Sequence, residues 1–382
     1  MRRLLAGIGI LAACTSASPS PSDAGPTDAS DAPVGVDVAP SLRARIITHA
    51  QGFVGRGVIE VAPAGVTERV PQLPTLTFGV VSDGLQEVFT LARADAPTPT
   101  ARSVYPISSI SKLVTGLIAA RGVTAGDFSA DAPARTLLAP DLASLVGDRS
   151  LLELLTHTAG YHPNPGNFTG PAERPAEGYT RTQLAACLGS APCATARAPR
   201  GAYLYSNLGV GLAGLALVDR YAMDFESLVT SRLTRELGMV DTHTRARSDD
   251  ARIVGGLTFA GLPVPPASMG ALAPAGELLS TGDDLLLLVR ALVRPPAAWE
   301  ATVRLATAPS AAAPQVGFAI DVLSRRGLDL RAKSGEQAGY SALVMWCPSL
   351  RVGAFALTNL GASSKTLAAL LIDLHVMLRE SL

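Results

Sequence analysis

Lysine is scarce in this sequence. The chain of 382 residues carries 32 basic residues, yet only three of them are lysines, Lys112, Lys333 and Lys365. Arginine keeps its charge at any accessible pH, whereas a lysine can release its proton when it is removed from water. Two of the lysines stand in short patterns with serine, Ser109-Ile-Ser-Lys112 and Lys333-Ser-Gly335. We therefore expect these two lysines to take part in chemistry.

Other absences exclude several classes of protein. The formal net charge is zero and no basic stretch stands out, which argues against a nucleic-acid partner and against electrostatic membrane binding. The sequence has no Cys-x-x-Cys, no His-Glu-x-x-His and no Gly-x-Ser-x-Gly pattern, and its histidines have no metal-ligand spacing. The histidines are His49, His157, His162, His243 and His375. We expect a monomer without a metal or other cofactor.

The N-terminus has the features of an export signal. Arg2 and Arg3 precede an apolar stretch, residues 4–12, that is too short to span a bilayer, and Leu11-Ala-Ala-Cys14 follows. This segment, residues 1–14, resembles a bacterial lipoprotein signal, which implies lipidation of Cys14 and attachment to a membrane. An ordinary secretory signal is the alternative. We expect an extracytoplasmic protein of the cell envelope, on the periplasmic side in a Gram-negative cell.

Residues 15–40 separate this signal from the folded part. They are rich in Ser, Pro, Asp, Ala and Thr, with little to bury, and are predicted to be a disordered spacer. The rest, residues 41–382, is long enough for one large domain or two interleaved ones, and no later apolar run is long enough for a transmembrane helix. An exported chain meets oxidising conditions, so a disulfide between Cys187 and Cys193 is predicted. Cys347 is expected to be a buried thiol.

Hydropathy and turn residues predict an α/β (α+β) fold. Strands are expected at both ends of the domain and helices between them, with tight turns joining the last strands into an antiparallel sheet. The expected strands are 75–81, 85–93, 317–323, 328–333, 341–347 and 352–357. The expected helices are 109–121, 151–157, 208–221, 225–237, 282–293 and 364–378. The helix that begins at Ser109 has hardly a polar face, which is typical of a helix buried inside a domain.

Ser109 and Lys112 form a candidate nucleophile and base. A serine hydroxyl needs a base within hydrogen-bond reach, and residues three apart share one face of a helix. An apolar environment would lower the pKa of the Lys112 ammonium toward a useful range. The alternative, purely structural interpretation is a capping serine followed by a lysine that extends to solvent. That interpretation fits poorly, because the helix after Lys112 offers no polar face.

Two further patterns complete the candidate site. Tyr205-Ser-Asn207 offers a phenol that can shuttle a proton and an amide that can hold a substrate carbonyl. Lys333-Ser334-Gly335 is expected at the end of a strand, where a cation and a hydroxyl can bind a carboxylate. Each pattern alone is weak, because turn residues and surface lysines are common. The three together, in this order, are far more specific.

With these patterns the chain resembles the serine β-lactamases and D-alanyl-D-alanine peptidases (penicillin-binding proteins), most closely their class C β-lactamase-like branch. The resemblance covers about residues 45–380. Besides the three patterns, it rests on the segments Tyr105–Lys112, Leu154–Gly160, Leu237–Thr242, Ala275–Thr281 and Gly353–Asn359. It implies an α/β part built from both chain ends, about 41–105 and 312–382, and an all-helical insertion, about 106–311, with the active site between them.

The resemblance also implies a role for each site residue. Ser109 would be the acylated nucleophile, Lys112 its partner in proton abstraction, and Tyr205 the base that later protonates the leaving group. Asn207 would position the substrate amide, while Lys333, Ser334 and Gly335 would bind the terminal carboxylate. The backbone N–H groups of Ser109 and Glu336 would form the oxyanion hole. His157 is interpreted as structural.

The leading functional hypothesis is a serine hydrolase that forms an acyl-enzyme with D-Ala-D-Ala-type peptidoglycan peptides, as a penicillin-binding D,D-carboxypeptidase or endopeptidase. A class C-like β-lactamase is the alternative, and an esterase of the same fold is a further one. A binding module without activity is disfavoured, because no site residue is missing. Two residues depart from the family pattern: Ser108 replaces the usual glycine or alanine, and Glu336 adds an acid that could select a cationic substrate group.

Overall fold

The computed structural model describes residues 40–62, 65–190, 193, 195–244 and 250–382. The predicted signal with Cys14, and residues 15–39 of the predicted spacer, lie outside the described residues. Residues 40–382 form one compact unit. Within the described ranges, no helix has both the length and the apolar character needed to cross a membrane.

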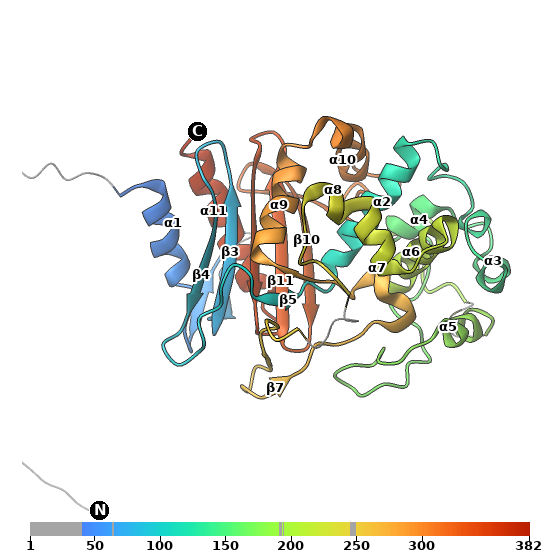
Figure 1. Ribbon diagram of the computed structural model, residues 1–382, viewed down its shortest axis with the longest axis horizontal. Coiled ribbons are helices and arrows are strands. Elements are labelled where there is room, and N and C mark those ends of the chain that lie inside the picture. The colour runs from blue at the N-terminus through green and yellow to red at the C-terminus, as the bar shows by residue number, and fades with distance from the viewer. Residues whose placement is uncertain (1–39, 63–64, 191–192, 194, 245–249) are drawn as a thin grey trace, which may run out of the picture. The chain divides into compact units, whose positions relative to one another are not determined.

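A six-stranded antiparallel sheet lies at the centre of this unit, with the strand order β4-β3-β12-β11-β10-β9 (Figure 1). Its strands are β3 (Thr75–Val81), β4 (Gln86–Ala92), β9 (Asp321–Arg325), β10 (Leu328–Gln337), β11 (Tyr340–Cys347) and β12 (Val352–Thr358). Two strands come from the first quarter of the chain and four from its end. The predicted antiparallel sheet built from both ends of the domain is therefore confirmed.

The remaining strands form three short pairs. They are β1 (Val58–Val61) with β2 (Glu68–Pro71), β5 (Val104–Pro106) with β8 (Leu279–Thr281), and β6 (Gly256–Leu257) with β7 (Pro263–Val264). Three of these strands, β6, β7 and β8, lie inside the segment 106–311. The expectation that this segment is all-helical is wrong in that respect, because β8 pairs with β5 at its border and a short β-hairpin forms beside it.

Eleven α-helices are found among the described residues. They are α1 (Leu42–Gln51), α2 (Ile110–Thr124), α3 (Pro140–Val146), α4 (Leu151–Leu155), α5 (Arg181–Leu188), α6 (Asn207–Tyr221), α7 (Phe225–Val229), α8 (Arg235–Leu237), α9 (Gly282–Val293), α10 (Glu300–Thr307) and α11 (Ser364–Arg379). A wider helical turn, Thr230–Thr234, joins α7 to α8. The predicted helix 225–237 is therefore continuous, although its winding changes.

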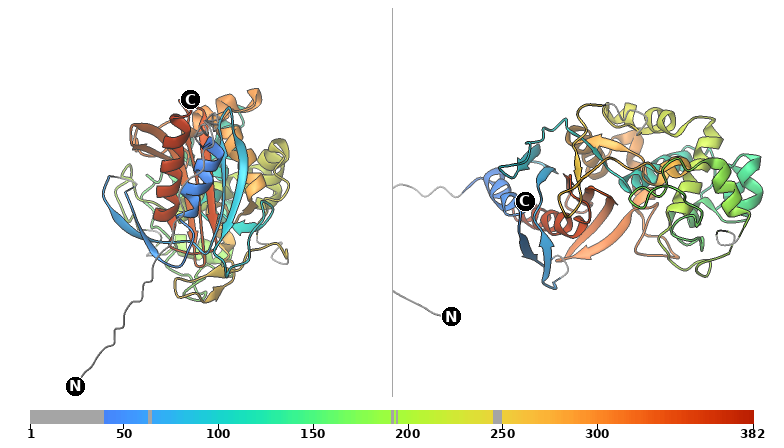
Figure 2. Two further views of the ribbon diagram at one scale, coloured as in Figure 1. Left: turned by 90° about the vertical axis from the view of Figure 1, so that its left-hand side faces the viewer. Right: turned by 90° about the horizontal axis from the view of Figure 1, so that it is seen from below.

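Helices cover both faces of the sheet. The terminal helices α1 and α11 lie side by side on one face, as Figure 2 shows, and bury residues such as Leu330, Leu343 and Leu370 between them and the strands. On the other face, α9 packs against β3 and β12 so closely that a Cβ atom on Gly353 would lie 2.6 Å from Val289. Since the central strands are buried on both sides, they read as continuous apolar runs.

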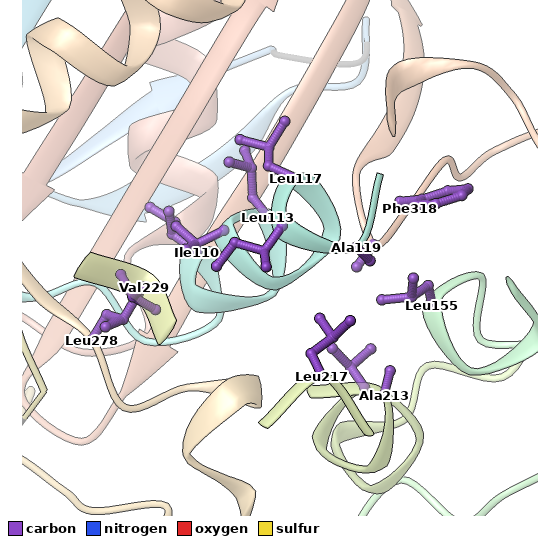
Figure 3. Close-up of a cluster of buried hydrophobic side chains, with 14 of the residues drawn as sticks. Ile110, Leu113, Leu117, Ala119, Leu155, Ala213, Leu217, Val229, Leu278 and Phe318 are labelled. Carbon is purple, nitrogen blue, oxygen red and sulfur yellow. The ribbon is translucent and has the colours of Figure 1, made fainter. Parts of the chain in front are cut away.

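Helix α2 is buried almost all round, as its sequence predicted. Its residues Ile110, Leu113 and Leu117 belong to a core cluster that includes Leu155 and Leu217 from α4 and α6 (Figure 3). Burying an apolar side chain of this size contributes about 1.5–3 kcal/mol to stability. The many buried residues of α2 therefore fix the helix, and the position of its first turn, firmly within the unit.

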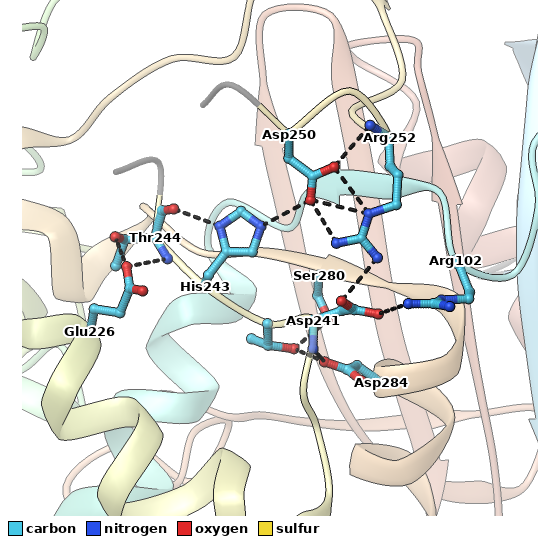
Figure 4. A network of polar contacts seen from close by, with 10 residues as sticks. Arg102, Glu226, Asp241, His243, Thr244, Asp250, Arg252, Ser280 and Asp284 are labelled. Carbon is cyan, nitrogen blue, oxygen red and sulfur yellow. Dashed lines mark hydrogen bonds and ion pairs between the residues drawn. The ribbon is translucent and has the colours of Figure 1, made fainter. Parts of the chain in front are cut away.

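A polar network anchors the segment that follows α8 (Figure 4). The Asp284 carboxylate, in the first turn of α9, accepts the backbone N–H of Asp241 at 2.9 Å and the Thr242 hydroxyl at 2.7 Å. Thr242 also lies 2.8 Å from the Ser280 hydroxyl on β8, and Arg252 pairs with Asp241 at 2.9 Å. These contacts connect the segment Leu237–Thr242 to α9 and to β8.

Two strand predictions need correction. Residues 317–320, predicted as part of a strand, instead form backbone hydrogen bonds with helices α4 and α10. Ala319 has a φ of 57°, and its N–H donates to the carbonyl of Leu155 in α4 at 2.9 Å. Strand β9 therefore begins only at Asp321. The predicted turn from Gly335 to Gly339 is shorter than expected, because β10 continues to Gln337 in register with β11. The Lys333-Ser334-Gly335 pattern thus lies within a strand.

Candidate active site

Ser109 lies in the turn between β5 and α2. The residue before it, Ser108, has a φ of 48°, in a region that residues with side chains seldom occupy. The Ser108 hydroxyl donates to Gln337 Oε1 at 3.2 Å, which ties the turn to β10. Ser109 directly precedes Ile110, the first residue of α2, so its backbone N–H belongs to the free donors at a helix N-terminus.

Lys112 is completely buried one helical turn further along α2. Its Nζ donates to Ser109 Oγ at 2.7 Å and to the backbone carbonyl of Ala275. Burial lowers the pKa of Lys112 to about 8; the nearby Tyr205 acts to raise it, and the positive charge of Lys333 lowers it again. A lysine with such a pKa can exchange its proton with Ser109 near neutral pH.

Tyr205 approaches Ser109 from the loop before α6. Its hydroxyl lies 3.0 Å from Ser109 Oγ and donates to it. Burial by itself raises the pKa of Tyr205, but the ammonium groups of Lys112 and Lys333 outweigh this and leave it below the ordinary value for tyrosine. Ser109 Oγ therefore has two partners, and both have a pKa shifted toward neutrality.

Asn207 is the first residue of α6 and faces the same site. Its side-chain amide donates to Asn164 Oδ1 at 2.7 Å. The helix start is fixed by Ser206, whose hydroxyl accepts the N–H of Gly209 at 2.8 Å and donates to the carbonyl of His162 at 2.6 Å. This cap places Tyr205 and Asn207 on either side of one well-anchored residue.

Lys333 reaches the site from β10. Its side chain is 2% exposed, and its Nζ lies 4.9 Å from the centre of the Tyr205 ring. Both carboxylate oxygens of Asp321, the first residue of β9, lie 3.5 Å from the same ammonium. The site therefore contains a carboxylate of the protein beside the cation that the sequence assigns to substrate binding.

Two hollows meet at Ser109. One has a volume of about 420 Å³ and is lined by Ser109, Tyr203, Tyr205, Asn207, Asp321, Lys333, Ser334 and Glu336. The other has a volume of about 210 Å³, and its lining includes Ser109, Asn164, Phe168, Asn207, Met269 and Gln337. A substrate whose scissile bond lies at Ser109 would have one part in each hollow.

Gly335 brings β10 very close to the nucleophile turn. A Cβ atom at this position would lie 2.1 Å from the carbonyl oxygen of Ile107 and 3.0 Å from the backbone nitrogen of Ser109. No other residue type fits there without displacing the turn. The next residue, Glu336, has its carboxylate turned to the start of α11, where it accepts the N–H of Ser364 at 2.9 Å.

Residues 64–376 of the sequence match the family model described as Beta-lactamase. The chain belongs to the beta-lactamase family. The structure resembles a class C beta-lactamase from Rhodobacter sphaeroides, with a TM-score of 0.62 and 20% identity over 80% of this chain and 94% of that chain. It also resembles a beta-lactamase from Sulfitobacter sp. EE-36, with a TM-score of 0.65 and 20% identity over 81% of this chain and 94% of that chain.

A relative is found among human proteins. "Putative beta-lactamase-like 1" from Homo sapiens is 31% identical over 160 residues, which is 39% of this chain and 32% of that protein. The match thus spans about a third of the human protein's length. Family membership and fold together make this chain a serine hydrolase of the beta-lactamase fold.

All the residues that the sequence assigned to catalysis and substrate binding are brought together in this beta-lactamase-family site. Ser109, Lys112 and Tyr205 touch one another, and Asn207, Lys333 and Ser334 line the larger hollow. Glu336 lines the same hollow, but its carboxylate accepts the N–H of Ser364 at the start of α11 and the Ser341 hydroxyl at 3.3 Å. The expectation that this acid selects a cationic substrate group is therefore not supported by its contacts.

Sequence reasoning missed Asp321 and part of the role of His157. No pattern marked Asp321, because its partner Lys333 lies on the neighbouring strand and the two meet only through the register of β9 and β10. His157 is buried beneath Tyr205, with the two ring centres 4.6 Å apart, and its Nδ1 accepts the N–H of Ser206 at 3.1 Å. It thus supports Tyr205 and the cap of α6.

The three described cysteines do not line either hollow at Ser109. Cys187, in the last turn of α5, forms a disulfide with Cys193, and their Cα atoms are 5.3 Å apart. Cys347, at the end of β11, is a buried free thiol. Among the residues that the structure describes, no group of three or more His, Cys, Asp or Glu side chains is arranged to hold a metal ion.

Proposed function

We propose that Ser109 is the nucleophile of an acyl-enzyme pathway and that D-Ala-D-Ala-type peptides of peptidoglycan are its substrates. The observation that carries the proposal is the pair of contacts at Ser109 Oγ, 2.7 Å to Lys112 Nζ and 3.0 Å to the Tyr205 hydroxyl. A serine alcohol becomes a nucleophile when a base within this distance can take its proton. The protein would act as a D,D-carboxypeptidase or endopeptidase.

The proposed reaction has two halves. Ser109 Oγ attacks the carbonyl carbon while its proton passes to neutral Lys112, and the negative charge that develops on the carbonyl oxygen is held by the backbone N–H groups of Ser109 and Glu336. Tyr205 then gives its proton to the leaving nitrogen as the scissile bond breaks, and takes one back from Lys112. In the second half, water attacks the Ser109 ester, which releases the acid and restores the serine.

Two features support a peptide substrate. Strand β9 pairs with β10 only as far as Ala332, so the segment from Lys333 to Gln337 has no strand on that side among the described residues. An extended peptide can pair with such an edge. Lys333 and Ser334 lie in the hollow beside this edge, and a cation with a hydroxyl suits a terminal carboxylate.

Labelling with a fluorescent penicillin tests the proposal, because a penicillin would acylate the same serine. The protein without residues 1–40 should be labelled, and Ser109→Ala should not be. Stable labelling supports the peptidase, whereas rapid turnover of a chromogenic cephalosporin would favour the class C-like β-lactamase. No Ser109-dependent labelling by either reagent would count against both functions.

Ester hydrolysis is a second candidate, and the contact of Asp321 with Lys333 favours it. The ammonium that would receive a substrate carboxylate already lies 3.5 Å from a carboxylate of the protein. An ester with an uncharged leaving group would need no free cation there. Ser109-dependent hydrolysis of simple aryl esters, together with absence of penicillin labelling, would select this candidate.

Attachment to a membrane through Cys14 is proposed from the sequence alone. The Leu-Ala-Ala-Cys14 segment supports it, and the Ser- and Pro-rich stretch up to residue 40 would hold the hydrolase away from the lipid surface. The full chain expressed in a bacterial host should incorporate labelled fatty acid and enter the detergent phase. Cys14→Ala should do neither, and fatty-acid labelling of that variant would exclude Cys14 as the anchor.

A further inference from the structure

We propose that Asp321 is a specificity-determining residue, which competes with a substrate carboxylate for Lys333 and so shifts the enzyme toward leaving groups without a carboxylate. The inference rests on the proposed acyl-enzyme at Ser109. It adds a residue that the family-like patterns do not contain, at the first position of β9.

The geometry puts Asp321 where a leaving-group carboxylate would have to bind. Its two carboxylate oxygens lie at equal distances, 3.5 Å, from Lys333 Nζ, and both residues line the hollow of about 420 Å³ next to Ser109. The Asp321 side chain is 28% exposed and faces this hollow, whereas that of Lys333 is 2% exposed. A carboxylate that entered this hollow and bound the ammonium would therefore lie beside Asp321.

No second cation among the described lining residues of the hollow offsets the negative charge that Asp321 places next to Lys333. Of the described residues that line the hollow, Lys333 is the only cation. Two acids also line it, but the Glu336 carboxylate is held by the N–H of Ser364, so Asp321 is the acid that contacts Lys333. Lys112 is buried behind Ser109 and donates to Ser109 Oγ and to the carbonyl of Ala275. The carboxylate of a substrate and that of Asp321 would repel each other beside the same buried ammonium. An incoming carboxylate must therefore displace Asp321 or bind weakly.

Asp321 also gives Lys333 a function that does not depend on a substrate. An unpaired ammonium that is 2% exposed would be costly, and the carboxylate of Asp321 offsets that cost. Lys333 can then stay charged beside the Tyr205 ring, 4.9 Å from its centre, before any substrate binds. In this arrangement the protein itself supplies the negative partner that a carboxylate-bearing substrate would otherwise bring.

A matched pair of esters tests the inference. Both carry the same N-acetyl-D-alanyl group, and their leaving phenols, 3-hydroxybenzoate and 3-hydroxybenzamide, differ only in the carboxylate. We call the ester of 3-hydroxybenzoate the carboxylate ester and the ester of 3-hydroxybenzamide the amide ester. The quantity measured is the ratio of kcat/KM for the carboxylate ester to kcat/KM for the amide ester. Because Asp321→Asn removes one charge next to Lys333, we expect this ratio to rise at least roughly tenfold, mainly through a lower KM for the carboxylate ester.

Controls separate this effect from a general change of charge or of folding. Asp329→Asn removes an exposed carboxylate of β10 that pairs with Arg331 outside the hollow, and it should leave the ratio unchanged. Asp321→Glu keeps the charge and should keep the ratio close to that of the unchanged protein. Turnover of the amide ester by each variant shows that its fold and nucleophile are intact. Should Asp321→Asn fail to fold, Asp321→Ser carries the same expectation.

The possible failures have different meanings. An unchanged or lower ratio in Asp321→Asn or Asp321→Ser, with the amide ester still hydrolysed, would overturn the inference and leave the proposed function standing. An equal rise in Asp329→Asn would also overturn it. If the unchanged protein and Ser109→Ala hydrolyse both esters at the same rate, then the proposed function fails, and the inference fails with it.

Discussion

Lys112 Nζ lies 2.7 Å from Ser109 Oγ, and the ammonium has no access to solvent. This contact decides between the two interpretations of the pattern, because a lysine that extended to solvent would leave the serine without a base. The helix that carries both residues is buried on nearly every side. The proposed chemistry at Ser109 thus depends on a lysine that the fold has removed from water.

The two buried lysines are expected to differ in their tolerance of arginine. Lys112→Arg should lower the rate of acylation roughly a thousandfold, because a guanidinium cannot act as a base at accessible pH. Lys333→Arg should keep a measurable fraction of the rate, since it preserves the positive charge beside Tyr205. The measurement is the rate of covalent labelling by a fluorescent penicillin.

Lys365→Arg is the matched control for this comparison, because Lys365 is exposed, pairs with Glu68 and lines neither hollow at Ser109. It should label at the rate of the unchanged protein. Thermal unfolding of each variant shows whether the fold is retained. Equal tolerance of arginine at Lys112 and Lys333 in folded variants would refute the assignment of their roles.

The pH profile of activity is expected to have a rising limb with its midpoint near pH 8. Acylation needs Lys112 in its neutral form, and burial sets its pKa at about 8, so raising the pH increases the active fraction. The charge of Lys333 lowers the pKa of both Lys112 and Tyr205, so Lys333→Gln should move the limb to higher pH. The profile of kcat/KM for the amide ester measures this.

The exposed lysine again provides the control for the pH profile. Lys365→Gln should leave the limb where it is, because Lys365 does not contribute to the pKa of either site residue. A limb that falls instead of rising near pH 8 would mean that protonated Lys112 is the working form. A limb that stays in place in Lys333→Gln would show that Lys333 does not act on the pair electrostatically.

Gly335→Ala should impair the site through the backbone. Its new Cβ atom would overlap the carbonyl of Ile107, so β10 and the turn at Ser109 would have to separate. A displacement of about 1 Å at a reacting group lowers rates roughly a hundredfold. Gly84→Ala is the control, because a Cβ atom there meets nothing within 4 Å. Equal penicillin-labelling rates in the two variants would contradict this account.

His157 is expected to make stability fall with acid. Burial, followed by the charges of Lys333 and Lys112, lowers the pKa of His157 well below 6.5, so the folded protein keeps it neutral where the unfolded chain binds a proton. Stability is therefore present above pH 6.5 and is lost as the pH falls, by about 1.4 kcal/mol per pH unit for each such histidine. His375, with a pKa of about 4, contributes in the same direction.

Urea unfolding of His157→Phe between about pH 5 and 6 tests this expectation. The variant should lose about 1–3 kcal/mol at neutral pH, because the buried N–H of Ser206 loses its acceptor. Its free energy of unfolding should then depend on pH less steeply than that of the unchanged protein, by about 1.4 kcal/mol per unit. Identical slopes would show that His157 is protonated in the folded state as well.

Much of the fold was predictable because its signals are local. The hairpin of β3 and β4 is marked by turn residues at 82–84, and the continuous apolar run of α2 predicts a buried helix. The strand predicted at 317–323 was wrong at its start, because residues 317–320 bind α4 and α10 through their backbone. The pattern of apolar residues cannot distinguish such a crossing from a strand.

The sequence by itself determined which side chains are available for chemistry: a serine and a lysine three apart on one helix, a tyrosine before another, and a second lysine on a strand. Those relations depend on covalent spacing and on helical or strand periodicity. Only the tertiary structure decided that Asp321 meets Lys333 and that His157 lies under Tyr205. Such contacts depend on strand register and on packing between segments far apart in the chain, and local periodicity carries no information about either.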